Sequence, residues 1–457
     1  MSLNPDSDPS RPPPAAPSTQ PPASAAEAAA ASSRPAPRTR LRALNSDDHE
    51  AVQALFRRHG WPVRSRSGWD WALIDSPARR ATGADAGWVL EHGDDVVGVL
   101  GNLPQSYHLD GLPVWGATCT SYLVDDAHRA HSTRLLRAFA AQPGAAFVFS
   151  ATANPHSAPV YRAFRFQPSP QPRAHQRLRW LASESAAAGF ALQRAHLGLL
   201  KPLAPVLALP RSAARRWRDR HLPSARDSGL HLSRVTQTDL ATASSHWPCT
   251  WDSWADGHRA RPGLWLDRSA ATMAWRLADP DLHKHLAAWA LRDGDGRMLG
   301  MCLARRVPDA AGTAPRVELM DWALNAAAPE GSGQQLLHAL LRWARDEKAA
   351  VVDAKRWTGD AATQLETLQP LREELPVDAV WLLAHQHASG PGIEGWPSWG
   401  MTGVDSDDWF NSHLKEAPAD ALPWSAPPQP PREADNSRTR SSMDSTAAGS
   451  KRSMSTA

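Results

Sequence analysis

One order of predicted elements occurs twice in this chain, and that repetition constrains the fold more than any other feature of the sequence. In each copy two apolar runs flank a turn containing Gly and Asp, His92–Asp95 in the first copy and Asp293–Gly296 in the second. A further apolar strand, an amphipathic helix and another apolar strand then follow. Because 457 residues exceed one typical domain of roughly 100–200 residues, we interpret the repeat as an internal duplication that gives two domains.

Composition suggests where these two units begin and end. Residues 1–37 and 413–457 are poor in large apolar side chains and rich in Pro, Ala or Ser, so we expect disordered tails there. The folded units are expected at 38–180 and 230–412, joined by a basic connector that contains proline, at 181–229.

Charge and cysteine content limit the class of protein. The 50 basic and 47 acidic residues leave a net charge of +3, which gives no reason to expect nucleic acid as a partner. Three widely separated cysteines fit reduced thiols better than a disulfide framework. Since no secretory signal or uninterrupted apolar run of about 18 residues is found, we expect a cytoplasmic protein without a transmembrane segment.

The first unit has a clear order of predicted elements. The spacing of apolar and turn residues predicts strand, helix, three antiparallel strands, helix, strand and helix. The first seven of these elements are expected at 41–43, 45–59, 88–91, 96–100, 114–124, 132–141 and 146–152, and the last helix carries Tyr161.

The segment 150–168 carries the most specific pattern. Asn154 opens a predicted helix, the small residue Ser157 follows three positions on, Tyr161 follows seven positions on, and an aromatic pair flanks Arg165. This pattern resembles the last strand and helix of the GNAT superfamily of acyl-CoA N-acyltransferases, with Arg165 in place of the usual Gly. The resemblance implies an α/β (α+β) fold with two GNAT-like domains, each a mixed, mostly antiparallel sheet flanked by helices.

Two tryptophan-containing patterns extend the resemblance to both units. Trp69-Asp70-Trp71, with Pro77 six residues later, resembles the start of a bacterial tandem-GNAT group associated with polysaccharide biosynthesis. Asp267-Arg268 with Trp275-Arg276 and Asp279-Pro280 resembles the matching start of its second half.

The resemblance also implies a binding site for acetyl-CoA or another acyl-CoA as co-substrate. The pyrophosphate is expected at the start of a helix, where backbone N–H groups attract anions, near Arg129, Ser132, Thr133 and Arg134. Ser132 and Arg134 stand where the family has glycines. The pantetheine arm is expected along Tyr122, Leu123 and Val124, and Asn154 lies at the start of the next helix.

Catalysis in such a site needs an acid and a base. The resemblance implies that the phenol of Tyr161 returns a proton to the CoA thiolate. Asp125 and His128 are the preferred candidates for the remaining proton transfer, with Asp126, Glu91 and His108 as alternatives. No metal is expected. Cys119 has two interpretations, a covalent acyl carrier or a buried inert thiol, and the second is favoured.

These patterns leave three functions open. The first is an N-acyltransferase that acts on an amine of a small molecule or amino-sugar precursor. The second is a Fem-like aminoacyl transferase, which the modest net charge disfavours. The third is a degenerate, non-catalytic GNAT binding or scaffold protein, and the oligomeric state is open.

The apolar stretch 190–209 also has two interpretations. Its leucines precede five arginines between Arg211 and Arg220, so it can rest on an anionic membrane surface as a peripheral contact. A helical strap between the domains is favoured, because prolines interrupt a long interfacial helix.

Overall fold

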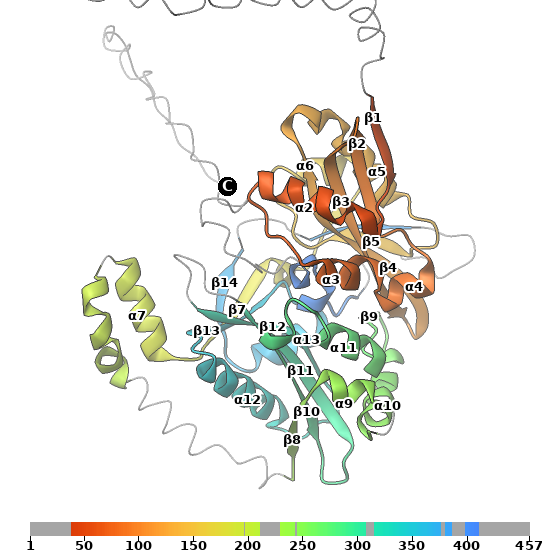
Figure 1. Cartoon of the computed structure of the whole chain (residues 1–457). Helices are drawn as coiled ribbons and strands as arrows, with labels where there is room; N and C mark the ends of the chain where they lie inside the picture. The colour runs from red at the N-terminus through yellow and green to blue at the C-terminus, as the bar shows by residue number, and fades with distance from the viewer. Residues whose placement is uncertain are drawn as a thin grey trace, which may run out of the picture.

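The protein is mixed α/β and contains two mixed, mostly antiparallel sheets flanked by helices (Figure 1). This computed structural model describes residues 38–195, 197–210, 229–242, 245–307, 315–375, 380–385 and 398–410. The predicted tails and most of the basic part of the connector lie outside the described residues.

The first sheet is antiparallel through four strands and then changes direction. β1 to β4 are neighbours in chain order, β4 pairs in parallel with β5, and two further strands complete the path. The order across the sheet is β1 (Thr39–Ala43), β2 (Gly87–His92), β3 (Asp95–Leu109), β4 (Leu112–Val124), β5 (Phe147–Ser150), β15 (Trp381–Ala384) and β6 (Gln167–Pro168), with β9 (Leu264–Leu266) pairing with the far end of β3.

Short helices flank this sheet on both faces. In α2 the buried positions include Val52, Leu55 and Phe56, whose helical spacing predicted one apolar face. The helical elements of this half are η1 (Ser46–Asp48), α2 (His49–Arg58), α3 (Arg66–Trp69), η2 (Asp70–Ile74), α4 (Pro77–Thr82), η3 (Asp126–His131), α5 (Ser132–Ala140) and α6 (Ala158–Ala163).

The second sheet follows the same plan. Its antiparallel run β8, β10, β11 and β12 leads into the parallel neighbour β13. The order is β14 (Leu371–Glu374), β7 (Gln176–Leu181), β13 (Val351–Lys355), β12 (Arg316–Leu324), β11 (Met298–Val307), β10 (Leu286–Arg292) and β8 (His231–Val235). The helical elements are η4 (Pro172–His175), α7 (Glu184–Arg194), η5 (Gly198–Leu203), α9 (Gln237–Ala241), α10 (Trp247–Arg259), α11 (Ala270–Leu277), η6 (His283–His285), α12 (Ser332–Asp346), α13 (Gly359–Glu366), η7 (Gly403–Asp405) and η8 (Asp407–Trp409).

The two halves exchange strands. Apart from its last residue, β7 belongs to the predicted first unit, 38–180, yet it lies between β13 and β14 of the second sheet. β15 belongs to the predicted second unit, 230–412, yet it lies between β5 and β6 of the first sheet. The division at residues 180 and 230 stays a prediction about the sequence, and the sheets do not follow it strand by strand.

A tryptophan pair joins the halves at their centre. The rings of Trp71 and Trp275 stack with centroids 4.7 Å apart. The indole N–H of Trp71 donates to the Trp275 carbonyl at 2.9 Å, and the reverse bond is 3.3 Å long. The two tryptophan motifs therefore meet in one contact, and most tryptophans that the structure describes are buried.

Candidate active site

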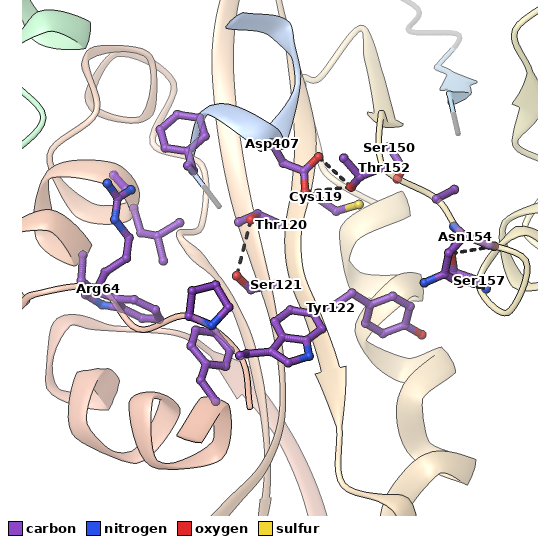
Figure 2. A pocket seen from close by; sticks show the side chains of 18 of the residues that line it. Arg64, Cys119, Thr120, Ser121, Tyr122, Ser150, Thr152, Asn154, Ser157 and Asp407 are labelled. Atoms are coloured by element: carbon purple, nitrogen blue, oxygen red, sulfur yellow. Dashed lines mark hydrogen bonds between the residues drawn. The ribbon is translucent and has the colours of Figure 1, made fainter. Parts of the chain in front are cut away.

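The first sheet opens where β4 and β5 separate. The two strands pair from Gly116–Phe147 to Thr118–Phe149, and β4 then continues to Val124 without β5. A cavity of about 120 Å³ lies at this opening (Figure 2). Its lining comes from both sides of the opening and from the end of the second half: Phe56, Trp61, Pro62, Val63, Arg64, Trp69, Ala72, Leu73, Cys119, Thr120, Ser121, Tyr122, Ser150, Thr152, Ala153, Asn154, Ser157, Tyr161, Asp407 and Phe410.

A β-bulge reshapes β4 beside the cavity. Thr120 lies opposite Gly101 and Leu123 lies opposite Val99, so two residues of β4 face one residue of β3. Ser121 in this bulge has φ = 55°, a left-handed conformation that costs energy for a residue with a side chain. The bulge therefore places a strained backbone in the wall of the cavity.

Tyr161 of α6 reaches the cavity from the helix that follows β5. Its hydroxyl lies 3.1 Å from the sulfur of Cys119 in β4. Burial raises the pKa of Tyr161 well above its usual value and raises the pKa of Cys119 to about 12. The phenol therefore stays protonated at neutral pH and can donate, and the high pKa favours the inert interpretation of Cys119.

Asp407 brings a carboxyl group into the same cavity from η8. The Thr152 hydroxyl donates to its two oxygens, at 2.8 and 2.9 Å (Figure 2). Burial, followed by the charge of Asp408, raises the pKa of Asp407 to about 7. Such a carboxyl group can take up and release a proton near neutral pH.

Aromatic side chains form the opposite wall. Trp61 and Phe56 stack with centroids 5.8 Å apart, and Trp69 and Phe410 line the cavity beside them. Arg64 reaches the cavity from the same side.

The charge of Arg64 is balanced by the second half. Its guanidinium donates to Asp279 at 2.6 Å and to Asp281 at 3.3 Å, while its Nη1 is buried with no hydrogen-bond partner. This side of the cavity is therefore largely apolar, with one buried donor.

The predicted pantetheine strand is split between two faces of the sheet. Tyr122 and Val124 pack with α5 and Tyr161, whereas Leu123 packs with the larger core on the other face. Of these three residues, Tyr122 lines the cavity.

Asn154 stabilises the turn that leads into α6. Its side-chain oxygen accepts from the backbone N–H groups of His156 and Ser157 at 2.9 Å, and the Ser157 hydroxyl accepts from the Asn154 N–H at 2.9 Å. Both residues line the cavity.

The predicted phosphate-binding residues surround the start of α5. Tyr122 donates its hydroxyl to the Ser132 carbonyl at 3.0 Å, which ties this start to the cavity wall. Tyr161 packs in the same cluster as the α5 residues Leu135 and Leu136, so Tyr161 and the start of α5 share one face of the sheet.

The arginines at this site have protein partners. Arg134 donates to the carbonyl of Thr39 at 2.8 Å. Arg129 pairs with Asp126 at 2.8 Å on the surface. Thr133 follows Ser132 in the first turn of α5. Phosphate binding by these residues stays a prediction.

The two candidate proton carriers of the loop lie outside the cavity lining. Asp125 pairs with Arg58 at 2.9 Å and with His59 at 2.7 Å, and these bonds lower its pKa despite partial burial. The ring of His128 packs on that of His92 with centroids 4.7 Å apart. Their catalytic roles remain predictions.

Among the described residues, no group of three or more His, Cys, Asp or Glu side chains is placed to hold a metal ion.

Sequence reasoning missed Asp407 and Arg64. Asp407 lies 255 positions from its partner Thr152, in a segment whose sequence has no motif. Arg64 follows α2 in a stretch for which we expected no element.

Comparison with known proteins gives similar structures but no similar sequence. No family model matches the sequence, and no curated protein matches it. A GCN5-related N-acetyltransferase from Kribbella flavida has a TM-score of 0.44 at 12% identity, covering 76% of this chain and 71% of that one. N-myristoyltransferase from Saccharomyces cerevisiae, solved with myristoyl-CoA, has a TM-score of 0.42 at 11% identity, covering 82% and 86%. A GCN5-related N-acetyltransferase from Anabaena variabilis has a TM-score of 0.41 at 13% identity, covering 76% and 72%. The chain is structurally similar to these two N-acetyltransferases and to N-myristoyltransferase.

Proposed function

We propose that this protein is an N-acyltransferase that moves an acyl group, acetyl in the simplest case, from acyl-CoA to an amine of a small molecule or sugar precursor. One observation carries the proposal. The hydroxyl of Tyr161 and the carboxyl of Asp407 line one buried cavity at the point where β4 leaves β5.

The opening supplies a place for the thioester. Because the described pairing of β4 with β5 ends at Thr118 while β4 continues to Val124, an amide-rich arm can add along β4 as a strand does, toward the cavity. The pyrophosphate is then proposed at the first turn of α5, near Ser132 and Thr133, with Arg129 and Arg134 beside it.

The reaction needs two proton transfers. The amine nitrogen attacks the thioester carbonyl, forming a C–N bond, and the C–S bond then breaks. We propose that Asp407 accepts the proton from nitrogen and that Tyr161 donates its proton to the departing sulfur. The proton held by Asp407 then restores the Tyr161 hydroxyl through water. The products are an amide and free CoA.

The aromatic wall is proposed as the acceptor side. Trp61, Trp69 and Phe410 offer flat apolar surfaces of the kind that stack on sugar rings. The buried Nη1 of Arg64 offers a donor to a hydroxyl or carbonyl oxygen of the acceptor.

The test combines ligand binding with a turnover assay. Acetyl-CoA and longer acyl-CoAs are titrated by calorimetry and thermal shift against wild type, Tyr161→Phe and Arg129→Ala, and CoA release is followed with a panel of amines. We expect Tyr161→Phe to bind normally but to transfer about 10²- to 10⁴-fold more slowly. Arg129→Ala should weaken binding. The matched control is Tyr107→Phe, which alters a buried tyrosine of the other core and should leave both readouts unchanged.

Each failure has a distinct meaning. If no acyl-CoA stabilises the protein, the chain is a non-catalytic binding or scaffold protein. If aminoacyl-tRNA stabilises it instead, a Fem-like reaction replaces this proposal.

A further inference from the structure

The connector folds into a helical hairpin with an unusual apolar surface. α7 is followed by η5, and residues 204–210 continue as a helix (Figure 1). Among the described residues, nine large apolar side chains are exposed, and seven of them belong to this hairpin. Leu199 is 97% exposed. The seven are Leu197, Leu199, Leu200, Leu203, Val206, Leu207 and Leu209, and we call them the leucine face.

Packing within the hairpin does not use the leucine face. The two arms meet through small residues, because a Cβ on Gly189 would lie 3.6 Å from the Cβ of Ala204. Ala204 and Ala208 are buried and lie one helical turn apart. The small residues close the hairpin, so the larger side chains point away from it.

The other residues that the structure describes do not cover this face either. Figure 1 places the hairpin at the side of the second sheet, beyond β13 and α12. Since the leucines are exposed, the prediction of a strap buried between the domains is wrong for 197–209. A large contiguous apolar patch on a protein marks an interaction site.

Charge identifies the kind of partner. From Arg194 to Arg220 the sequence contains seven Lys or Arg and one acidic residue, Asp219, which gives 7 − 1 = +6. The whole chain carries +3, so the remainder is negative by three charges. Within the described part of this stretch, Lys201 is exposed among the leucines. Positive charge is therefore concentrated in the segment of the sequence that contains and follows the leucine face.

We propose that the leucine face docks this protein on an anionic lipid bilayer. Leucine side chains enter the boundary between headgroups and acyl chains, while basic side chains contact the lipid phosphates. No helix in the described part of the chain is long and apolar enough to span a bilayer, so the contact is interfacial. The prolines of this stretch are compatible with it, because a compact hairpin presents the face without one long helix.

The test uses the full chain and vesicles of two compositions. Wild type is sedimented with vesicles of phosphatidylcholine mixed with phosphatidylglycerol, and with pure phosphatidylcholine. The variant is the triple change Leu199→Ser, Leu203→Ser and Leu207→Ser. The matched control is Leu112→Ser with Leu371→Ser, the two exposed leucines that the structure describes outside the hairpin. Thermal unfolding and acetyl-CoA binding verify that every variant is folded.

We expect wild type and the control to bind the phosphatidylglycerol vesicles at least about tenfold more tightly than the triple variant. Binding should weaken with added salt and with pure phosphatidylcholine. Equal binding by the triple variant would overturn the proposal, because charge alone would then suffice. Absence of binding by wild type would also overturn it. If wild type instead dimerises without vesicles and the triple variant is monomeric, the face is an interface between two copies.

Discussion

In both halves the fourth strand of an antiparallel run pairs with its parallel neighbour for three residue pairs and then leaves it. The last pairs are Thr118–Phe149 in the first half and Glu318–Asp353 in the second. Each departing strand carries a bulge, at Ser121–Tyr122 in β4 and at Met320 in β12. The backbones are thus equivalent at this point, and the side chains decide what each opening becomes.

Small residues keep the first opening hollow. Ser150 ends β5, Thr152 and Ala153 follow it, and all three line the cavity. In the second half the corresponding stretch after β13 contains Trp357, which is 2% exposed.

A second tryptophan packs in the core of the other half, where the opening between β12 and β13 retains a cavity of only about 20 Å³. Trp322 of β12 is 1% exposed, and its indole N–H donates to Gln364 of α13 at 3.1 Å. Gln364 in turn donates to the Leu324 carbonyl at 3.3 Å, so a side chain bonds to β12 beyond its last pair with β13. The same arrangement of strands therefore surrounds a cavity in the first half and a tightly packed core in the second half, depending on the volume of a few side chains.

One short element contacts both openings. In η8, Asp407 accepts from Thr152 of the first half, whereas its neighbour Asp408 accepts from Arg356 of the second half at 2.8 Å. These two carboxylates give a matched pair of variants.

The largest effect is expected from that pair. Asp407→Asn cannot accept a proton, so kcat should fall by about 10²- to 10⁴-fold. Asp408→Asn should keep kcat within a few fold, since its partner lies outside the cavity. Steady-state rates of CoA release check this. If kcat falls by a similar factor in both variants, the loss comes from a displaced η8 and not from the missing proton acceptor.

Removal of Trp322 should affect stability more than chemistry. Trp322→Ala leaves a cavity in the second core and should cost about 3–5 kcal/mol in the free energy of unfolding. Tyr122→Ala at the equivalent opening of the first half should cost less, because Tyr122 is partly exposed, but should weaken acyl-CoA binding. Urea unfolding and calorimetry separate these outcomes. A larger stability loss for Tyr122→Ala would contradict the comparison.

The pH dependence follows from the raised pKa of Asp407. Its folded pKa of about 7 exceeds the ordinary value of 3.8, so the folded state binds the proton more tightly than the unfolded state. Protonation of Asp407 therefore adds to the free energy of unfolding below about pH 4, and this contribution is lost as pH rises through about 7. Between about pH 4 and pH 7, the free energy of unfolding of wild type should decrease with rising pH. This decrease should exceed the decrease in Asp407→Asn by an amount on the order of 1–4 kcal/mol.

Activity should show the opposite trend. Because the proposed base must be ionised, the wild-type rate should rise with an inflection near pH 7. Thermal melts and rate profiles over the same pH series measure both. A wild-type rate that is flat from pH 5 to 8 would remove Asp407 from this role.

The smallest effect is expected from filling the first opening. Ala153→Leu adds volume to the cavity lining, so acyl-CoA affinity should fall about tenfold or more. Ala163→Leu adds the same atoms at an exposed position of α6 and serves as the control. Calorimetric titration with acetyl-CoA gives both affinities. Unchanged affinity in Ala153→Leu would place the thioester elsewhere.

Local signals in the sequence predicted the individual elements well. The turns at His92–Asp95 and Asp293–Gly296 and the periodic apolar residues of α2 depend on neighbours close in sequence. The predicted strands 88–91, 114–124 and 146–152 correspond to β2, β4 and β5, and the predicted strand 96–100 is the first part of the longer β3.

Such local signals do not predict which strands pair when the strands are distant in the sequence. The residues of β7 and β15 do not indicate which sheet each strand joins. The apolar pattern of a strand predicts its burial, but it does not predict which other strand it pairs with. The same limit applies to the site. Tyr161 has a local pattern, whereas Asp407 reaches the cavity through tertiary structure alone.

The exchanged strands have a consequence for how the chain is made. On the ribosome, residues 39–168 emerge early, but the position between β5 and β6 stays vacant until Trp381–Ala384 are synthesised. The first sheet therefore exposes two unpaired edges for most of translation, a condition that favours aggregation or chaperone binding. A gene cut after residue 180, the predicted boundary, should yield two fragments, neither of which completes its own sheet, because β7 and β15 are then on the wrong fragments.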